Sequence, residues 1–497
     1  MRIAFVASEC VPFSKTGGLA DVAGALPEAL SALGHQVEMV IPRYRTTHPG
    51  EALPGASDLT LPLTSGFRFA SVQRGDTIKG VKHYLVECPE FFDREGLYQS
   101  KDGKDYPDNP LRFAAFPLAA IEFLKRGPAP PDVIHCHDWQ TALAPVYLKT
   151  RYRDDPFFSH TSVVLTIHNL GYQGLFGPEV LRQVTLDEGL FTIDGLEFFG
   201  KVNYLKGGIV FSDFITTVSR RYAAEIQTTE FGCGLDGVLR SRAERLQGIM
   251  NGVDYDAWNP ATDKLIAARY TPENLEGKRA CKKALLERMG ATDPALDRPV
   301  IGIVSRFASQ KGFDLIAHLA AELIRMDAYV VALGTGEPQY EQLFREWAAG
   351  FPGKFLVKVA YDNGLAHQIE AGADIFLMPS RYEPCGLNQI YSLKYGAVPV
   401  VRATGGLDDS IQEFDGVNGT GFKFSEYSAQ ALLEALERAL TTYRQPALWR
   451  RLMQNGMKQD FSWSASARAY ARIYEQLAAA APGRNHAGQR ASNAVDA

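Results

Sequence analysis

The sequence predicts an α/β protein made of two doubly wound domains, each with a parallel sheet between layers of helices. Short apolar, β-branched runs alternate with helical patterns along the chain, which is the order of βαβ units. The alternation stops near the middle of the chain and then starts again, so two halves of similar size follow one another. A chain of 497 residues is also too long for one compact core.

The composition excludes several classes of protein. Hydrophobic residues make up 46% of the chain and charged residues 22%, which is typical of a soluble globular protein. The net charge of −5 argues against nucleic acid or an anionic membrane as the main partner. The N-terminus lacks a signal-peptide pattern, and no apolar stretch is long enough to span a bilayer. We therefore expect a cytoplasmic protein whose six scattered cysteines are reduced.

The first half is expected to form a parallel sheet with an antiparallel edge. The predicted strands lie at residues 3–7, 36–41, 132–137, 162–168, 214–219 and 247–250. The predicted helices between them lie at residues 20–33, 111–126 and 141–150. Residues 51–100 contain more Gly, Pro and alternating residues, which favours an antiparallel excursion at the sheet edge.

The second half repeats the pattern after a linker and an entry helix at residues 251–294, where Asn-Gly, Asn-Pro and Asp-Pro pairs interrupt regular structure. Residues 428–480 are expected to be mostly helical. Residues 481–497 have few bulky apolar side chains and are expected to be disordered. The predicted strands of this half lie at 299–305, 329–333, 355–360, 375–379, 398–402 and 421–424.

One stretch near the N-terminus has the features of an anion-binding loop. Residues 14–21 read Ser-Lys-Thr-Gly-Gly-Leu-Ala-Asp and lie between a predicted strand and a predicted helix. Gly17 and Gly18 allow the backbone to approach a ligand closely. Lys15 adds positive charge beside the free N–H groups of the helix start. The alternative is an ordinary loop with a surface lysine, because the spacing matches neither the phosphate-loop nor the dinucleotide motif.

The strand predicted at 132–137 carries residue types that can bind a metal. His135 and His137 share one face of this strand, and Cys136 points the other way. No second cluster with zinc-ligand spacing accompanies them. We therefore expect no metal site.

Asp138 and His168 stand at the ends of two predicted strands. Side chains in that position can hydrogen-bond a hydroxyl-rich ligand. The alternatives are that Asp138 caps the next helix and that His168 only stabilises its loop.

In the second half, Arg306 and Lys311 follow a predicted strand and precede a helix. Arginine offers a bidentate fork to phosphate and lysine a compact charge, so the pair fits a diphosphate. Glu383 lies in a second strand-to-helix loop, just before Gly386, and Thr404 lies in a third. A glutamate in such a loop is often solvated or caps a helix, but beside two cations it becomes a ligand candidate.

Nearly all of these residues lie at predicted carboxyl ends of strands, in both halves. In open α/β sheets ligands bind at those ends, and a cleft between domains is a common ligand site. The shared placement predicts one ligand held between two facing domains.

The chain resembles bacterial members of the glycogen/starch synthase family over about residues 1–480. The resemblance rests on an ordered set of motifs, which is far more specific than any single member. The motifs are KTGGLADV at 15–22, HDWQ at 137–140, TIHN at 166–169, GLDG at 234–237, NGVD at 251–254, WNPATD at 258–263, QKG at 310–312 and EPCGL at 383–387.

The resemblance implies a GT-B fold, with two facing Rossmann-like domains and an interdomain cleft. It implies an acceptor-side domain at 1–250, a nucleotide-sugar domain at 251–460 and a last helix at 461–480 that packs back on the first domain. The family transfers glucose from ADP-glucose to the non-reducing end of an α-1,4-glucan, retains the anomeric configuration and needs neither a metal nor another cofactor. The implied partners are therefore a nucleotide sugar and a glucan such as glycogen or maltodextrin.

The resemblance also implies roles for individual residues. Lys15, with Gly17 and Gly18, belongs to the donor-binding loop, and Arg306 and Lys311 hold the diphosphate. The remaining contacts are Asp138, His168 and Asn251 near the sugar, Tyr361 beside the base, Glu383, Cys385, Gly386 and Leu387 at the glucose and phosphate, and Thr404 at the phosphate.

One position departs from many retaining GT-B enzymes, which carry a second glutamate eight residues after the first. That position here is Tyr391, and the synthases as a group lack this glutamate. A double displacement by two carboxylates is therefore not expected. We expect attack on the same face of the sugar, with a leaving phosphate oxygen taking the proton of the acceptor.

The sequence leaves three other functions open. A related transferase or a phosphorylase would use another donor, and a phosphorylase would need a lysine bound to pyridoxal phosphate. A dinucleotide-dependent oxidoreductase is disfavoured, because Gly-x-Gly-x-x-Gly does not follow the first strand. A catalytically inactive glycan-binding protein is disfavoured by Lys15, Arg306, Lys311 and Glu383. The sequence does not fix ADP against UDP in the donor.

Overall fold

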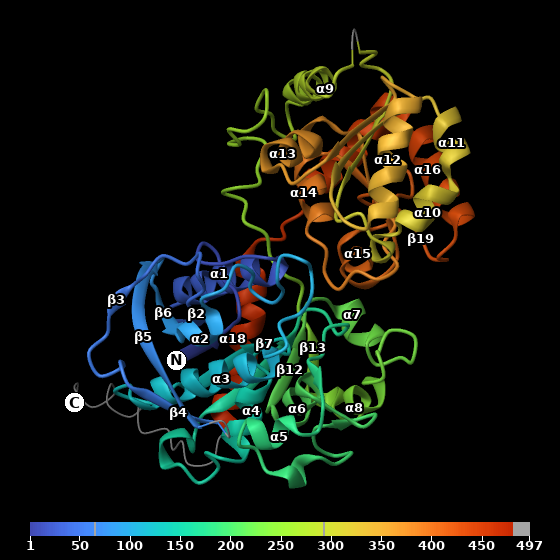
Figure 1. Ribbon diagram of the computed structural model, residues 1–497. Helices are drawn as coiled ribbons and strands as arrows, with labels where there is room; N and C mark the ends of the chain where they lie inside the picture. The colour runs from blue at the N-terminus through green and yellow to red at the C-terminus, as the bar shows by residue number, and fades with distance from the viewer. Residues whose placement is uncertain (64–65, 292–293, 481–497) are drawn as a thin grey trace, which may run out of the picture. The chain divides into compact units, whose positions relative to one another are not determined.

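The computed structural model describes residues 1–63, 66–291 and 294–480, and it divides into two compact units (Figure 1). Unit 1 comprises Met1–Thr217, Ile226–Ile249 and, at the end of the described chain, residues 463–480. Unit 2 comprises Val218–Glu225 and Met250–Ser462. The tail predicted at 481–497 lies outside the described residues.

Unit 1 is built on a ten-stranded sheet with the order β13-β12-β8-β7-β1-β2-β6-β5-β3, in which β4 also pairs with β5. Pairing is parallel from β13 to β6. All residues of β7 and β8 are buried, as expected for parallel strands covered on both faces. The parallel strands are β1 (Arg2–Val6), β2 (Gln36–Pro42), β6 (Val81–Glu87), β7 (Val133–His137), β8 (Ser162–Ile167), β12 (Phe214–Thr217) and β13 (Leu246–Gly248).

The antiparallel edge predicted for residues 51–100 is confirmed in part. Strands β3 (Glu51–Ala52) and β4 (Leu59–Leu63) pair antiparallel with β5 (Gly66–Ile78), and β5 pairs antiparallel with β6. The prediction is wrong for β6, which runs parallel to β2 and extends the central sheet. A separate small antiparallel sheet contains β9 (Leu175–Phe176), β10 (Glu197–Phe198) and β11 (Lys201–Asn203).

Helices cover the sheet of unit 1. On one face, α1 and α18 pack against the apolar side chains of the central strands, including Phe5, Met39 and Val133. The helices of this unit are α1 (Gly18–Ala32), α2 (Pro89–Phe92), α3 (Asn109–Lys125), α4 (Leu143–Lys149), α5 (Val180–Gln183), α6 (Tyr204–Phe211), α8 (Asp236–Ser241) and α18 (Trp463–Ala480).

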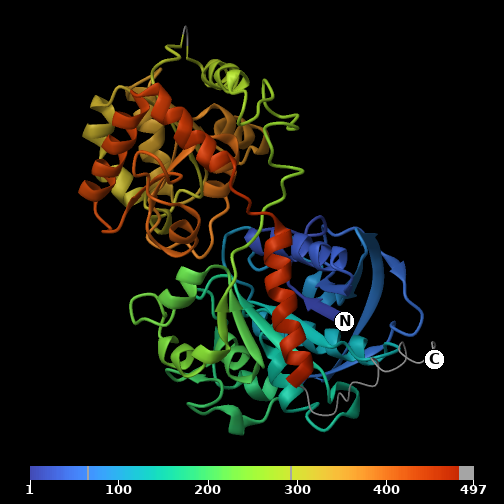
Figure 2. The same cartoon turned by 180° about the vertical axis from the view of Figure 1, so that it is seen from behind.

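The last helix, α18, comes from the end of the described chain and lies in unit 1, where it is drawn in red in Figure 2. Its buried side chains recur at helical spacing on one face, through Trp463, Ala467, Tyr470, Tyr474 and Leu477. They pack against α1 and the central strands.

Unit 2 contains a six-stranded sheet with the order β16-β15-β14-β17-β18-β19, in which all pairs are parallel. Its strands are β14 (Val300–Val304), β15 (Tyr329–Gly334), β16 (Phe355–Val359), β17 (Ile375–Met378), β18 (Val398–Arg402) and β19 (Phe422–Phe424). Its helices are α7 (Arg220–Glu225), α9 (Glu276–Arg288), α10 (Phe313–His318), α11 (Ala320–Arg325), α12 (Pro338–Gly350), α13 (Asn363–Gly372), α14 (Asn388–Tyr395), α15 (Gly405–Ser410), α16 (Ala429–Tyr443) and α17 (Pro446–Met457).

One predicted strand ends earlier than the sequence indicates. The run at 214–219 forms β12 only as far as Thr217, and the next residues leave the sheet of unit 1. Ser219 is buried in unit 2, where its hydroxyl donates a hydrogen bond to the Pro384 carbonyl at 2.5 Å. This tertiary contact ends the strand, although the apolar pattern continues to Val218.

All six cysteines are free thiols, and five of them are buried. Within the described residues, no helix combines the length and the apolar character needed to cross a bilayer.

Candidate active site

The strand orders create one topological switch point in each sheet. It lies between β1 and β7 in unit 1 and between β14 and β17 in unit 2. Ligands of open α/β sheets bind beyond the carboxyl ends of the strands at such points. In unit 1, Lys15 and Asp138 follow the two strands, and in unit 2, Arg306, Lys311 and Glu383 do so. The fold therefore groups the predicted residues of each unit at its switch point.

The loop after β1 is held by Glu9, which the sequence analysis did not select. Its carboxylate accepts hydrogen bonds from the Thr16 backbone N–H, from the Thr16 hydroxyl at 3.0 and 3.1 Å, and from the Gly17 N–H at 3.3 Å. Burial raises the pKa of Glu9, while the hydrogen bonds from Thr16 and Gly17 oppose that rise. Some of the backbone N–H groups that were predicted to bind an external anion thus donate to the carboxylate of Glu9 instead. Its place directly beyond β1 was the signal that could have found it.

Lys15 and the two glycines lie beside Glu9 on the same loop. The Lys15 ammonium is partly exposed and lies 2.6 Å from the Asp21 carboxylate on α1. A Cβ atom at Gly17 or Gly18 would meet no neighbouring atom of the described structure closer than 4.0 Å. Packing inside the protein therefore does not require glycine at these two positions.

Asp138 leaves β7 in a left-handed backbone conformation, with φ of 55°. Its carboxylate accepts hydrogen bonds from the backbone N–H groups of His168, at 2.7 Å, and Asn169. Burial raises the pKa of Asp138 to about 7, against the opposing effect of those hydrogen bonds. Asp138 thus joins the ends of β7 and β8. The alternative that it caps the next helix is wrong, since Ala142 is the N-cap of α4.

His168 is part of a line of imidazoles across the ends of β7 and β8. Its Nε2 lies 3.0 Å from Nδ1 of His137. Burial lowers the pKa of His168 to about 3, so this ring is neutral at physiological pH. A neutral imidazole in this position can hydrogen-bond a sugar hydroxyl but carries no charge.

His135 and His137 lie on one face of β7, as predicted, with ring centroids 4.3 Å apart. Nε2 of His135 lies 2.6 Å from the Thr166 hydroxyl, and its Nδ1 lies 2.7 Å from the Tyr474 hydroxyl of α18. Burial lowers the pKa of both histidines well below the usual value. No group of three or more His, Cys, Asp or Glu side chains in the described part of the chain is arranged to hold a metal ion.

In unit 2, Lys311 and Glu383 form an ion pair across the switch point. The Lys311 Nζ lies 2.6 Å from Oε2 of the buried Glu383, and the Ser380 hydroxyl donates to the same oxygen at 3.0 Å. The Arg306 side chain is exposed, and its Nη2 lies 3.3 Å from Oε1 of Gln310. The structure therefore brings two of the three predicted charged residues of this unit into contact.

The loop after β17 continues from Glu383 to Leu387 at the start of α14. Burial raises the pKa of the Cys385 thiol to about 12, so Cys385 is protonated at neutral pH and is not a thiolate nucleophile. The backbone of Asn251 bonds to this thiol. Oδ1 of Asn251 is buried and has no hydrogen-bond partner among the described residues. A buried acceptor without a partner is costly, so this atom is suited to accept a hydrogen bond from a ligand. Gly386 has φ of 68° and turns the chain into α14.

The other predicted residues of unit 2 have different environments. Tyr361, after β16, is 86% exposed. The Thr404 hydroxyl donates to the Glu225 carboxylate at 3.1 and 3.2 Å, a partner that the sequence analysis missed. Tyr391, at the position of the absent second glutamate, stacks on Trp258 with ring centroids 4.0 Å apart.

Comparison with protein families matches both halves of the chain. A family described as starch synthase catalytic domain matches residues 2–241, and a family described as glycosyl transferases group 1 matches residues 288–459. The chain is 54% identical over 478 residues to the glycogen synthase of Koribacter versatilis, covering 96% of this chain and 98% of that protein. It is 46% identical over 489 residues to the glycogen synthase of Thermotoga maritima, covering 96% and 99%.

A solved structure of a starch synthase also matches nearly the whole chain. The catalytic domain of starch synthase IV from Arabidopsis thaliana, bound to ADP and acarbose, matches with a TM-score of 0.87 and 33% identity, covering 96% of this chain and 99% of that one. The described chain therefore has the GT-B fold predicted from its sequence.

Proposed function

Because this chain belongs to the glycogen/starch synthase family and is a glycogen synthase enzyme, we propose that it transfers glucose from ADP-glucose to the non-reducing end of an α-1,4-glucan with retention of configuration. The observation that carries this proposal is the ion pair between Lys311 and the buried Glu383 at the switch point of unit 2, where Arg306 also follows a strand. A nucleotide sugar presents a diphosphate and a sugar, and these side chains suit both. The ADP seen with the plant starch synthase catalytic domain supports the choice of nucleotide.

In the proposed reaction, Arg306 and Lys311 stabilise the negative charge that develops on the leaving diphosphate. Fixed cations stabilise such a charge without reorganisation during the reaction. Glu383 holds Lys311 in place and meets the glucose, while Cys385, Gly386 and Leu387 line the same loop. Tyr361, exposed beyond β16, flanks the base.

The predicted residues of unit 1 are proposed to contact the sugar or to form the loop that binds the donor. The neutral His168 and the Asp138 carboxylate hydrogen-bond sugar hydroxyls, and Lys15 contributes charge to the donor site. The open space at Gly17 and Gly18 supports a close approach of the donor, since no neighbouring atom requires glycine there. In unit 2, the unpartnered oxygen of Asn251 accepts a hydrogen bond from the bound donor.

The proposed chemistry proceeds on one face of the sugar. The acceptor hydroxyl attacks the anomeric carbon as the bond to the phosphate oxygen breaks, and that oxygen takes the proton of the acceptor. The buried, protonated thiol of Cys385 takes no part as a nucleophile. Thr404 is proposed to contact the phosphate, although its hydroxyl is bound to Glu225 in this structure. We also propose that the enzyme acts in the cytoplasm and needs no cofactor.

A parallel assay with two donors tests this function. The protein is incubated with glycogen and either ADP-glucose or UDP-glucose, and nucleotide release and chain growth are measured. We expect both to proceed faster with ADP-glucose. Faster transfer from UDP-glucose would contradict the proposed donor. Nucleotide release without chain growth would contradict the proposed acceptor.

A further inference from the structure

The segment Val218–Glu225 belongs to unit 2, although the residues on both sides of it, Thr217 and Ile226, belong to unit 1. Its helix α7 packs against α15 of unit 2. The chain thus leaves the sheet of unit 1 after β12, docks eight residues on unit 2 and returns. None of the motifs that point to the family covers this segment.

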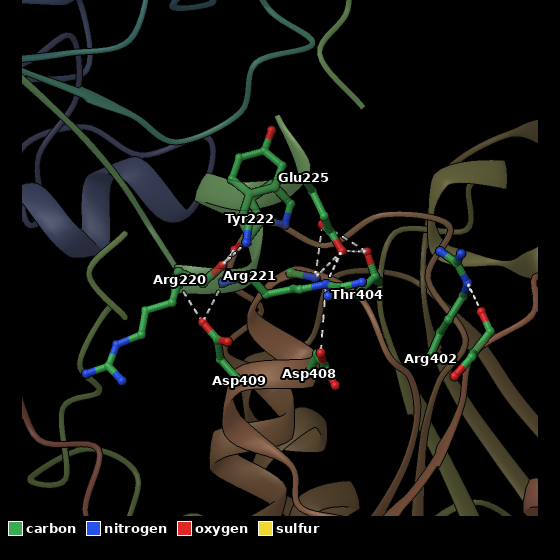
Figure 3. Close-up of polar contacts among 12 residues, drawn as sticks. Arg220, Arg221, Tyr222, Glu225, Arg402, Thr404, Asp408 and Asp409 are labelled. Carbon is green, nitrogen blue, oxygen red and sulfur yellow. Dashed lines mark hydrogen bonds and ion pairs between the residues drawn. The ribbon is translucent and has the colours of Figure 1, made fainter. Parts of the chain in front are cut away.

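The two helices bind each other's N-terminal groups (Figure 3). The Asp409 carboxylate on α15 accepts hydrogen bonds from the backbone N–H groups of Arg220, at 2.6 Å, and Arg221, at 3.0 Å. In the other direction, the Glu225 carboxylate accepts hydrogen bonds from the Thr404 hydroxyl and the Gly405 N–H, all between 3.1 and 3.2 Å. These reciprocal bonds fix α7 on the first turn of α15.

Glu225 is buried in this arrangement, with 5% of its surface exposed. Arg221 lies over it, with Nε 3.2 Å from Oε1 of Glu225 and 3.8 Å from Oδ2 of Asp408. The negative charge of Glu225 is thus matched by the adjacent guanidinium of Arg221 and by the N–H dipole of Gly405. Charge-assisted hydrogen bonds of this kind are stronger than neutral ones.

The turn that Glu225 holds lies directly against the loop of Glu383. The Gly406 N–H donates to the Glu383 carbonyl at 3.0 Å. A Cβ atom at Gly405 would lie 1.9 Å from the Glu383 carbonyl oxygen, and one at Gly406 would lie 1.9 Å from that of Cys385. Only glycine allows this approach of the two backbones. A displacement of the turn therefore displaces the loop.

Ser219, the residue directly before α7, contacts the same loop through its hydrogen bond to the Pro384 carbonyl. The loop residues on either side of Pro384 are Glu383, which pairs with Lys311, and Cys385. The backbone of the Glu383 loop sets the position of the Lys311–Glu383 pair. The segment Val218–Glu225 holds this backbone in two ways, directly through Ser219 and through the turn that Glu225 binds.

We propose that Glu225 and Ser219 are positioning residues, which hold the loop of Glu383 in its reactive place through the Thr404–Gly406 turn and the Pro384 carbonyl. The inference rests on the proposed function, because it assigns these residues to the same site.

The test compares Glu225→Ala, Glu225→Gln and Ser219→Ala with wild type. Misplacing a reacting group by about 1 Å costs on the order of 10²-fold in rate, so we expect Glu225→Ala to lower kcat by about 10- to 100-fold. Glu225→Gln keeps an acceptor oxygen and is expected to recover part of that loss. The KM for ADP-glucose is expected to change less than kcat, since the diphosphate cations remain.

The matched control is Glu413→Ala, which also removes a carboxylate of unit 2 that accepts a backbone N–H, that of Lys423. It is expected to change thermal stability without changing kcat. If Glu225→Ala lowers the melting temperature but its folded fraction turns over like wild type, the positioning role is overturned. Tighter ADP binding by Glu225→Ala would also overturn it, because Glu225 would then compete with phosphate for Thr404.

Hydrogen exchange separates a failure of this inference from a failure of the proposed function. Peptides covering residues 383–387 and 404–410 are expected to exchange faster in Glu225→Ala than in wild type or Glu413→Ala. This readout needs no substrate, so it stands even if wild type does not transfer glucose. Unchanged exchange in both peptides would show that Glu225 does not hold the loop.

Discussion

Lys311 and Glu383 hold each other at the switch point of unit 2. The carboxylate is buried and fixed by Ser380, while the lysine remains partly exposed. This arrangement leaves the ammonium oriented and accessible, as a cation that meets a phosphate must be. In the proposed reaction, the pair links the geometry of the Glu383 loop to the charge that develops on the leaving diphosphate.

Removal of a cation that is proposed to bind the phosphate tests this link. We expect Lys311→Ala and Arg306→Ala each to lower kcat by roughly 10²-fold or more, as loss of one oxyanion-type donor does. Steady-state rates with ADP-glucose and glycogen measure the effect. Lys283→Ala, which alters an exposed side chain of α9, is the control and is expected to retain wild-type turnover. A folded Arg306→Ala or Lys311→Ala variant with wild-type turnover would contradict the phosphate assignment.

Asp138 predicts a pH dependence of stability. An aspartate in the unfolded chain has a pKa of about 3.9, whereas burial raises the pKa of Asp138 to about 7 in the folded protein. The folded state therefore holds the proton more tightly than the unfolded state. The contribution of Asp138 to the free energy of unfolding is complete below a pH of about 4 and is lost as the pH rises to about 7. The free energy of unfolding of wild type, relative to Asp138→Asn, is expected to fall by up to about 1.4 kcal/mol per pH unit in this range and to level off above it. Urea unfolding at a series of pH values measures it, and a constant difference would contradict the buried carboxyl.

For single residues, the sequence predicted which side chains stand at strand ends but not which of them pair. Lys15 pairs with Asp21 in this structure, and Lys311 pairs with a glutamate 72 positions away. Glu225 was missed because a lone carboxylate carries no local pattern, and Glu9 was missed although it stands directly beyond β1. Their partners are backbone N–H groups of helix starts, which only the folded chain brings to them.

Among the elements, α18 shows how a segment remote in sequence completes the core of unit 1. Its Tyr474 hydroxyl reaches Nδ1 of the buried His135 in the middle of the parallel sheet. The helix therefore provides both apolar packing and a hydrogen-bond partner for a buried imidazole. The histidines of β7 serve the core, although their sequence pattern also allowed a metal site to be considered.

Substitution at Tyr474 measures this contribution. Tyr474→Phe leaves the packing of the ring intact but removes a hydrogen-bond partner of His135, so we expect a loss of about 1–3 kcal/mol in the free energy of unfolding. Tyr172→Phe, on an exposed side chain of unit 1, is the control and is expected to change stability by less than about 0.5 kcal/mol. A cost for Tyr474→Phe no larger than that of the control would show that the buried contact contributes nothing.

The elements themselves were largely predictable, because buried parallel strands form apolar runs and amphipathic helices repeat every three to four residues. Strands β1, β2, β7, β8 and β12 lie where the sequence placed them to within about two residues. The exceptions have tertiary causes. Strand β6 joins the parallel sheet through its pairing with β2, and β12 stops early where Ser219 bonds to the Pro384 carbonyl.

In the whole molecule, each unit is assembled from separate ranges of the chain, so neither unit is one continuous stretch. The sequence alternation predicted two halves but not the exchange of Val218–Glu225, because eight residues with an ordinary helical pattern carry no mark of the unit on which they pack. The predicted roles of Arg306 and Lys311 also lead to an expectation for the complete enzyme.

If side-chain cations neutralise the leaving diphosphate, activity does not depend on a divalent metal. We expect glucose transfer by the complete enzyme to continue at an unchanged rate in excess chelator. The rate before and after chelation, with and without added Mg²⁺, measures this. A strict requirement for a divalent ion would contradict the assignment of charge neutralisation to Arg306 and Lys311.

The central claim, retaining transfer from ADP-glucose to the end of a glucan, is tested most directly by one labelled-donor experiment. The enzyme is given ADP-glucose labelled with ¹³C at the anomeric carbon together with a maltodextrin acceptor, and the product is analysed by NMR. We expect the label to appear in α-1,4 linkage at non-reducing ends, with one ADP released for each glucose transferred. A β-linked label, or label found only in free glucose, would contradict it.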